Sequence, residues 1–162
     1  MTYGSGTVSG EEWLDTVTLA PDLVISQQSI SVANSSSGFE GLGIDGILGL
    51  GPVDTTIDTV SNTETVPTVL DNLLSQGRVP EEVFGVYYVP ISEISAGELT
   101  IGGYDNSAVS SPVNYVPLTT TSPASEYWGI DQSITYGSDT ILSSTAGIVD
   151  TGTTFILIAT GE

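Results

Sequence analysis

Glycine and proline divide this chain into short segments, and their spacing limits its possible folds more than any other sequence feature. The 162 residues include 19 glycines and 8 prolines, and the segments between them are rich in Val, Ile, Thr and Tyr. Turn-forming residues between short β-branched segments are typical of antiparallel hairpins. The sequence therefore predicts an all-β protein with mainly antiparallel strands. The expected strands lie in segments 7–19, 22–33, 83–89, 97–103 and 129–137.

One segment departs from this β pattern. Between Val66 and Leu74, apolar residues recur at intervals of i, i+3, i+4, i+7 and i+8, which is the stripe of an amphipathic helix. Pro67 suits the start of such a helix, and Gly77 can end it in a left-handed conformation. We therefore expect one or two short helices within the β fold.

The composition excludes several classes of function. Twenty acidic residues stand against a single basic residue, Arg78, and the net charge is −19, so nucleic acid and anionic membranes are poor partners. The chain has no cysteine and no histidine, which excludes disulfides, thiol nucleophiles, thiolate metal sites and an internal Ser-His-Asp triad. No segment of the sequence is apolar over the length of a membrane span.

The segment Ile148 to Thr154, IVDTGTT, holds the first candidate for chemistry. The two β-branched residues Ile148 and Val149 indicate the end of a strand. Asp150-Thr151-Gly152 then predicts a sharp turn, which glycine allows without a Cβ clash. Nearby amides and hydroxyls can hydrogen-bond the carboxylate and fix its orientation. An aspartate on such a turn can be half of a carboxylate pair that activates water, although Asp-Thr-Gly taken alone is also a common turn.

Three other motifs precede this segment. Residues 3–7, YGSGT, suit the tip of a β-hairpin, with Tyr3 placed to present its ring and hydroxyl to whatever the hairpin covers; taken alone, the motif is only a turn. Residues 45–51, DGILGLG, predict a short buried strand between glycines, where other backbone can pass close. Residues 34–36, Asn-Ser-Ser, match a glycosylation sequon at Asn34, a triplet that also arises by chance.

Together and in this order, these motifs resemble those of the pepsin-like aspartic endopeptidases. The sequence runs from YGSG through DGILGLG, PTVLDNLLSQG, IGGYD and YW to IVDTGTT, so the resemblance covers nearly the whole chain. It looks closest to the cysteine-free, Ser- and Thr-rich acid proteases of fungi, of the polyporopepsin type. The resemblance implies a bilobal pepsin-like acid protease fold, of which this chain looks incomplete at both ends.

The resemblance assigns a role to each motif. Asp150 matches the catalytic aspartate of the second lobe. The residues of its turn are Thr151, Gly152 and Thr153. The flap tip of the first lobe, which closes over the substrate backbone, is matched by Tyr3, Gly4 and Ser5. The residues expected to line the substrate pockets are Ile44 and Ile47 before the scissile bond, and Tyr127 and Ile148 after it.

The same resemblance predicts two lobes. Residues 1–105 would be the later part of the N-terminal lobe, and residues 106–162 the first part of the C-terminal lobe. In the family, the first lobe's own Asp-Thr-Gly precedes the flap, so we expect this chain to be an internal fragment that lacks one catalytic aspartate. A retroviral-type homodimer is the alternative source of a second aspartate. In those chains the triplet precedes the flap, whereas here Asp150 follows Tyr3, which favours the two-lobed arrangement.

Two segments imitate these motifs. Residues 135–138, TYGS, echo the flap sequence but are predicted to form an ordinary hairpin. Residues 15–17, DTV, have valine in place of the turn glycine and lie in an alternating run, so they are predicted to belong to a strand.

The resemblance implies hydrolysis of peptide bonds at acid pH by a water held between two carboxylates. Two like charges so close share a proton, so one carboxyl group acts as base and the other as acid, which is the established behaviour of aspartic proteases. It further implies a polypeptide substrate, an extracellular location, a monomeric full-length enzyme, and neither cofactor nor metal. The alternative is a pepsin-fold protein that binds its ligand without hydrolysing it. In proteins of that class, one or both catalytic aspartates are replaced.

The chain by itself is expected to be inactive, because it carries one catalytic aspartate of the two. It is also expected to fold poorly alone, because unpaired strand edges and exposed apolar surface favour aggregation.

Overall fold

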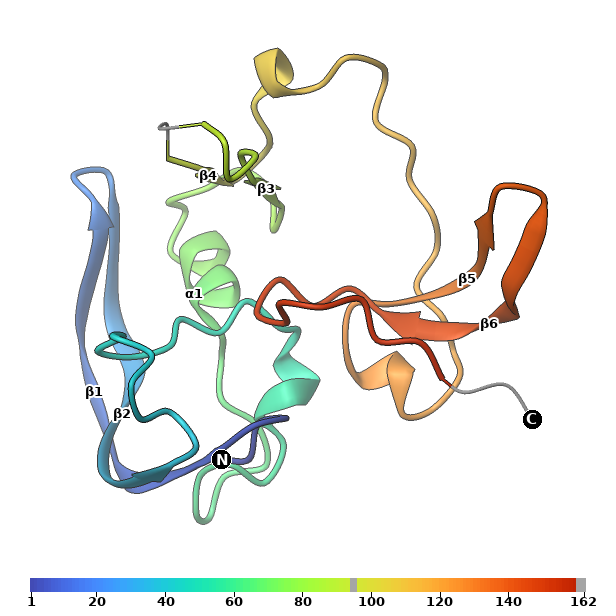
Figure 1. The fold of residues 1–162 in the computed structure, drawn as a ribbon. Coiled ribbons are helices and arrows are strands. Elements are labelled where there is room, and N and C mark those ends of the chain that lie inside the picture. Colours follow the sequence, from blue (N-terminus) through green and yellow to red (C-terminus); the bar gives the residue numbers. More distant parts are fainter. Residues whose placement is uncertain (94–95, 160–162) are drawn as a thin grey trace. The chain divides into compact units, whose positions relative to one another are not determined.

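In the part of the chain that the structure describes, the strands pair in three antiparallel hairpins. The computed structural model describes residues 1–93 and 96–159; two positions of the predicted first lobe and the last three of the second lie outside the described residues. Within this part of the chain, the sheets are two-stranded, with the pairings β1–β2, β3–β4 and β5–β6 (Figure 1). The predicted antiparallel β fold is therefore confirmed. Contacts divide the chain into a first unit, Met1–Val113, and a second unit that begins at Asn114.

A long hairpin of β1 (Thr7–Ala20) and β2 (Leu23–Ser37) opens the first unit (Figure 1). The predicted strands 7–19 and 22–33 fall within it, and so do residues 15–17. The register shifts between Ser9 and Gly10, because Ser9 pairs with Ser35 and Gly10 with Ala33. Asn34 is therefore the extra residue of a β-bulge.

The predicted helix is α1 (Val69–Ser75). Thr68 and Asp71 form a capping box at its start, which satisfies backbone N–H groups that the helix itself leaves unpaired. At its end, Gly77 has a φ of +64°, and the next N–H group donates to the Leu73 carbonyl oxygen at 2.8 Å, as in a Schellman motif. Pro67 precedes the cap residue, so it lies just outside the helix and not in its first turn.

The core of the first unit forms where α1 packs against β2. Ile25 of β2 and Leu73 of α1 have no exposed surface, and Val69 and Val79 are 7% exposed. Burying a side chain of this size stabilises a fold by about 1.5–3 kcal/mol. The middle of the predicted apolar stripe, Val69, Leu70 and Leu73, is thus the buried face of α1, whereas Val66 precedes the helix and Leu74 is 39% exposed.

Side-chain amides tie the same two elements together. The buried Gln28 side chain accepts a hydrogen bond from Asn72 Nδ2 at 3.0 Å. Gln76 accepts from the Ser26 backbone N–H group at 3.0 Å and donates to the Ser26 carbonyl oxygen at 2.9 Å. In the described part of the chain, β2 pairs with β1 along one edge, and no strand lies along its other edge. These contacts satisfy polar groups of β2.

The remaining elements are short. In the first unit, β3 (Phe84–Tyr87) pairs with β4 (Glu98–Ile101), and the 3₁₀ helices are Val53–Thr56 and Asn106–Ala108. In the second unit, the 3₁₀ helix Ala124–Glu126 precedes β5 (Gly129–Tyr136) and β6 (Asp139–Ile148). Gly137, with a φ of +61°, lies in the turn of that hairpin, so residues 135–138 form an ordinary hairpin as predicted. None of the described helices has the length and apolar character needed to cross a membrane.

The prediction for residues 45–51 was wrong. The segment is not a strand and does not lie in a core: Ile47 is 50% exposed and Leu48 46%. A buried strand needs neighbours that pair with it and cover its faces. Among the described residues, no strand pairs with this segment, so the Ile47 and Leu48 side chains remain at the surface.

Candidate active site

Asp150 lies on an exposed turn directly after β6. Its Oδ1 accepts a hydrogen bond from the Gly152 N–H group at 2.9 Å, and its Oδ2 accepts one from Thr153 Oγ1 at 2.5 Å. The Asp150 carbonyl oxygen accepts from the Thr153 N–H group at 3.4 Å. The turn therefore orients the carboxylate and leaves it open to solvent.

The β5–β6 hairpin places two other predicted residues beside this turn. Gly129 at the start of β5 pairs with Ile148, and the Val149 N–H group donates to the Trp128 carbonyl oxygen at 2.9 Å. Tyr127 precedes Trp128, so Tyr127, Ile148 and Asp150 lie at the same end of the hairpin. Tyr127 is 43% exposed and Ile148 46%, which leaves apolar surface near the carboxylate.

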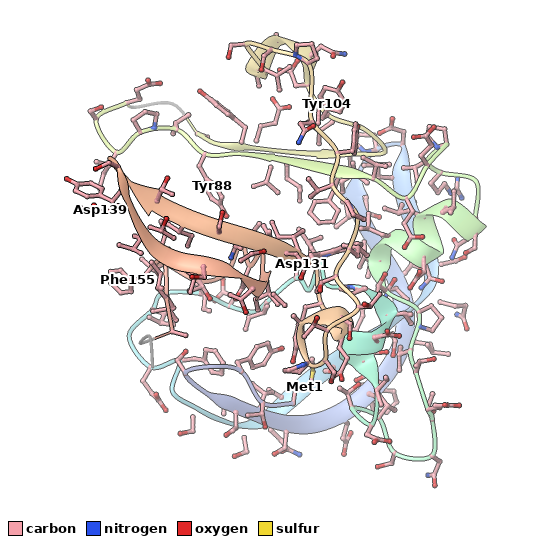
Figure 2. The ribbon with its side chains drawn as sticks, turned by 90° about the vertical axis from the view of Figure 1, so that its right-hand side faces the viewer. Met1, Tyr88, Tyr104, Asp131, Asp139 and Phe155 are labelled. Atoms are coloured by element: carbon pink, nitrogen blue, oxygen red, sulfur yellow. The ribbon has the colours of Figure 1, made fainter. Side chains whose placement is uncertain are left out.

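A buried threonine supports the same end of the hairpin. Thr119, 5% exposed, donates from Oγ1 to Asp131 Oδ1 at 2.8 Å, and its N–H group donates to the Gly129 carbonyl oxygen at 2.9 Å. Asp131 lies on β5 (Figure 2). The sequence did not indicate Thr119, because the partners that define its role lie in a different segment of the chain.

The predicted flap tip is a tight hairpin in the first unit. Thr2 and Thr7 form an antiparallel bridge, and the Tyr3 N–H group donates to the Gly6 carbonyl oxygen at 2.7 Å. Gly4 and Ser5 are exposed at the turn, whereas Tyr3 is half-buried. This burial raises the pKa of the Tyr3 hydroxyl above its ordinary value.

Phe39 contacts the Tyr3 ring edge to face. The ring centroids are 5.6 Å apart, and the ring planes meet at 85°. The sequence did not single out Phe39. Phe39 could have been found from the sequence only with knowledge of the strand pairing. Because β1 and β2 pair along their whole length, residue 39 lies beside the flap tip.

The other two predicted pocket residues lie in the irregular segment that follows Phe39. Ile44 is 51% exposed and Ile47 50%, and both belong to the first unit with the flap tip. Their role as pocket residues remains a prediction. The described residues contain no group of three acidic or metal-ligating side chains that could hold a metal ion.

Comparison with known proteins assigns the family. The sequence model for "Eukaryotic aspartyl protease" matches residues 1–162. The chain belongs to this family. Asp150 and its turn thus belong to an aspartyl protease sequence, as the order of motifs predicted.

Among its relatives, this aspartyl protease chain is 56% identical over 98% of its length to polyporopepsin from Irpex lacteus, of which it covers 47%. It is 37% identical over 98% of its length to rhizopuspepsin-1 from Rhizopus niveus, of which it covers 39%. Its structure matches the crystal structure of the aspartic proteinase from Irpex lacteus with a TM-score of 0.92 and 56% identity, over 98% of this chain and 47% of that one. The chain therefore spans about half the length, or less, of these relatives.

Proposed function

We propose that the protein is an aspartic endopeptidase and that Asp150 is one of its two catalytic carboxylates. The observation that carries this proposal is the geometry of the Asp150 turn. Both carboxylate oxygens accept hydrogen bonds from the turn itself, at 2.9 and 2.5 Å, and the group stays exposed. A carboxylate that is oriented but accessible can hold a water for attack on a carbonyl group.

The proposed reaction needs a second carboxylate from outside residues 1–162. One carboxylate takes a proton from the bound water as the water attacks the peptide carbonyl carbon, and the other carboxyl group donates a proton to the carbonyl oxygen. Such a pair must share a proton to work, because two adjacent negative charges repel. The enzyme should therefore act in acid and use no cofactor.

The proposed substrate is a polypeptide bound in an extended conformation. The flap tip of Tyr3, Gly4 and Ser5 would cover the peptide backbone and exclude water. Apolar side chains on either side of the cleaved bond would contact the predicted pocket residues, which are Ile44, Ile47, Tyr127 and Ile148. Exposed isoleucine and tyrosine side chains support an apolar preference.

Substitution of Asp150 tests the proposal. In the complete gene product, Asp150→Asn should lower peptide hydrolysis in acid by roughly a thousandfold or more, because the amide can neither accept the proton of the water nor share one. Asp139→Asn is the matched control, since Asp139 lies at the far end of the same hairpin (Figure 2). Near-normal turnover by Asp150→Asn would refute the assignment. A wild-type protein that binds peptides without cutting them would instead support the non-catalytic alternative.

We further propose that the protein is extracellular and carries a glycan on Asn34. Asn34 is exposed at the bulge of β2, which leaves its side-chain amide accessible for modification. Mass spectrometry of the secreted protein should show a glycan that Asn34→Gln removes, and an unmodified Asn34 would contradict this.

A further inference from the structure

The orientation of the Tyr3 side chain is not set by the backbone pairing of the flap tip. The last ladder pair between β1 and β2 is Thr7 with Ser37. Beyond it, the tip is held by the Thr2–Thr7 bridge and by the hydrogen bond from Tyr3 N–H to Gly6. Both of these are backbone contacts, so the direction of the Tyr3 ring depends on its side-chain contacts. The Tyr3 hydroxyl donates to Met1 Sδ at 3.8 Å, and the Tyr3 ring itself contacts Phe39.

Two glycines bring the tip close to the segment that follows β2. A Cβ atom on Gly6 would overlap the Ser37 carbonyl oxygen and the Phe39 ring. Gly38 has a φ of +87°, and a Cβ atom there would overlap the Ser5 carbonyl oxygen. Because a side chain fits at neither position, the tip backbone can approach Phe39 closely.

The aromatic contact follows from this close approach. The Tyr3 and Phe39 rings are both on half-buried residues, and their centroid distance of 5.6 Å and angle of 85° are those of an edge-to-face pair. The ring quadrupoles favour this arrangement over a face-to-face one. The contact joins residues that are far apart in sequence, so it links the flap tip to the chain that leaves the hairpin.

We propose that Phe39 is a positioning residue of the flap, which holds the Tyr3 ring in the orientation needed to cover a bound peptide. This inference rests on the proposed endopeptidase function. Phe39 acts through Tyr3 and needs no contact with the reacting atoms. Without the Phe39 ring, Tyr3 would populate other rotamers, and the flap would cover the peptide in a smaller fraction of the molecules.

Kinetics of the complete gene product give the first test. Phe39→Leu keeps an apolar side chain but removes the ring, and loss of an edge-to-face pair should lower kcat/KM by about two- to tenfold. Phe39→Tyr keeps the ring and should stay within about twofold of wild type. Tyr136→Leu is the matched control, because it removes a ring that is 80% exposed at the β5–β6 hairpin, and its activity should not change.

A double substitution separates positioning from a general structural role. In a Tyr3→Leu background, Phe39→Leu should cause no further fall in kcat/KM, because its effect passes through the Tyr3 ring. Fully additive losses would overturn the proposal, since a structural role of Phe39 does not depend on Tyr3.

A spectroscopic readout makes the test independent of catalysis. With 3-fluorotyrosine incorporated, Tyr3→Phe identifies the ¹⁹F resonance of Tyr3. That resonance should shift in Phe39→Leu and stay in place in Tyr136→Leu. A Tyr3 resonance that does not move overturns the proposed positioning even if the protein is an active protease. A wild-type protein that hydrolyses no peptide refutes the proposed function, and the ¹⁹F resonance then still reports whether the Tyr3 ring contacts Phe39.

Discussion

At the scale of single residues, Thr153 is as important to the site as the glycine of its turn. Its hydroxyl donates to Asp150 Oδ2 at 2.5 Å, while the Gly152 N–H group serves the other oxygen. The sequence placed Thr153 in the turn, but only the structure shows that its side chain, and not merely its backbone, holds the carboxylate.

Removing that hydroxyl should impair the proposed peptide hydrolysis. A hydrogen bond to a charged group contributes about 1.5–3 kcal/mol, so Thr153→Val in the complete gene product should lower kcat/KM by roughly ten- to a hundredfold. Thr153→Ser retains the donor and is the control. Steady-state kinetics on a peptide substrate would check this, and equal activities of the valine and serine variants would contradict it.

At the scale of elements, the ends of α1 are set by neighbouring residues, whereas its position against β2 is set by residues distant in sequence. The capping box of Thr68 and Asp71 and the left-handed Gly77 are sequence-local, so the ends of the helix could be predicted to within a few residues. Its contacts with β2 through Gln28 and Gln76 could not. These side chains were unremarkable in sequence, because their partners lie tens of residues away.

The carboxyl groups of Asp71 and Glu82 couple the start of α1 to the loop that follows it. Partial burial raises the pKa of Glu82 above its ordinary value of 4.5, and the hydrogen bond and negative charge of the Asp71 carboxyl group raise it further. The Asp71 carboxylate also accepts the Thr68 N–H group at 2.7 Å. A proton on the Glu82 carboxyl group would relieve the repulsion beside the helix cap.

This pair should make stability depend on pH. The folded state binds the proton more tightly than the unfolded state, so the stabilisation is fully present below about pH 4.5 and is lost as pH rises through the raised pKa of Glu82. We expect the Tm of the complete gene product to fall less between acid and neutral pH in Glu82→Gln than in wild type. Thermal melts across that range would check this, with Glu81→Gln as the control. Identical pH dependence in wild type and Glu82→Gln would contradict it.

At the scale of the whole molecule, the described residues leave much apolar surface uncovered. Buried apolar residues in this part of the chain are few: Ile25, Val69, Leu70, Leu73, Val79 and Ala124. In contrast, Phe155, Ile156 and Leu157 are consecutive and at least 75% exposed. Contiguous apolar surface and two-stranded sheets with open edges favour association with other chains.

Residues 1–162 expressed alone should therefore aggregate or bind a hydrophobic dye. The net charge of −19 opposes association at neutral pH and low salt but is screened as salt is added. Light scattering and dye fluorescence over a salt series would check this, with the complete gene product as reference. A soluble monomer with one cooperative melting transition would contradict the prediction.

The sequence by itself predicted the strands β1 to β5, the helix and the turn of Asp150, because strand alternation, helical periodicity and glycine conformations act over a few residues. The order of its motifs also indicated the protease family. Only the tertiary structure decided what surrounds those motifs. The Tyr3–Phe39 contact, the Thr119–Asp131 hydrogen bond and the exposure of residues 45–51 all depend on which distant segments meet. The conformational preferences of neighbouring residues do not predict such long-range contacts, since burial and side-chain pairing are set by the packing of whole elements.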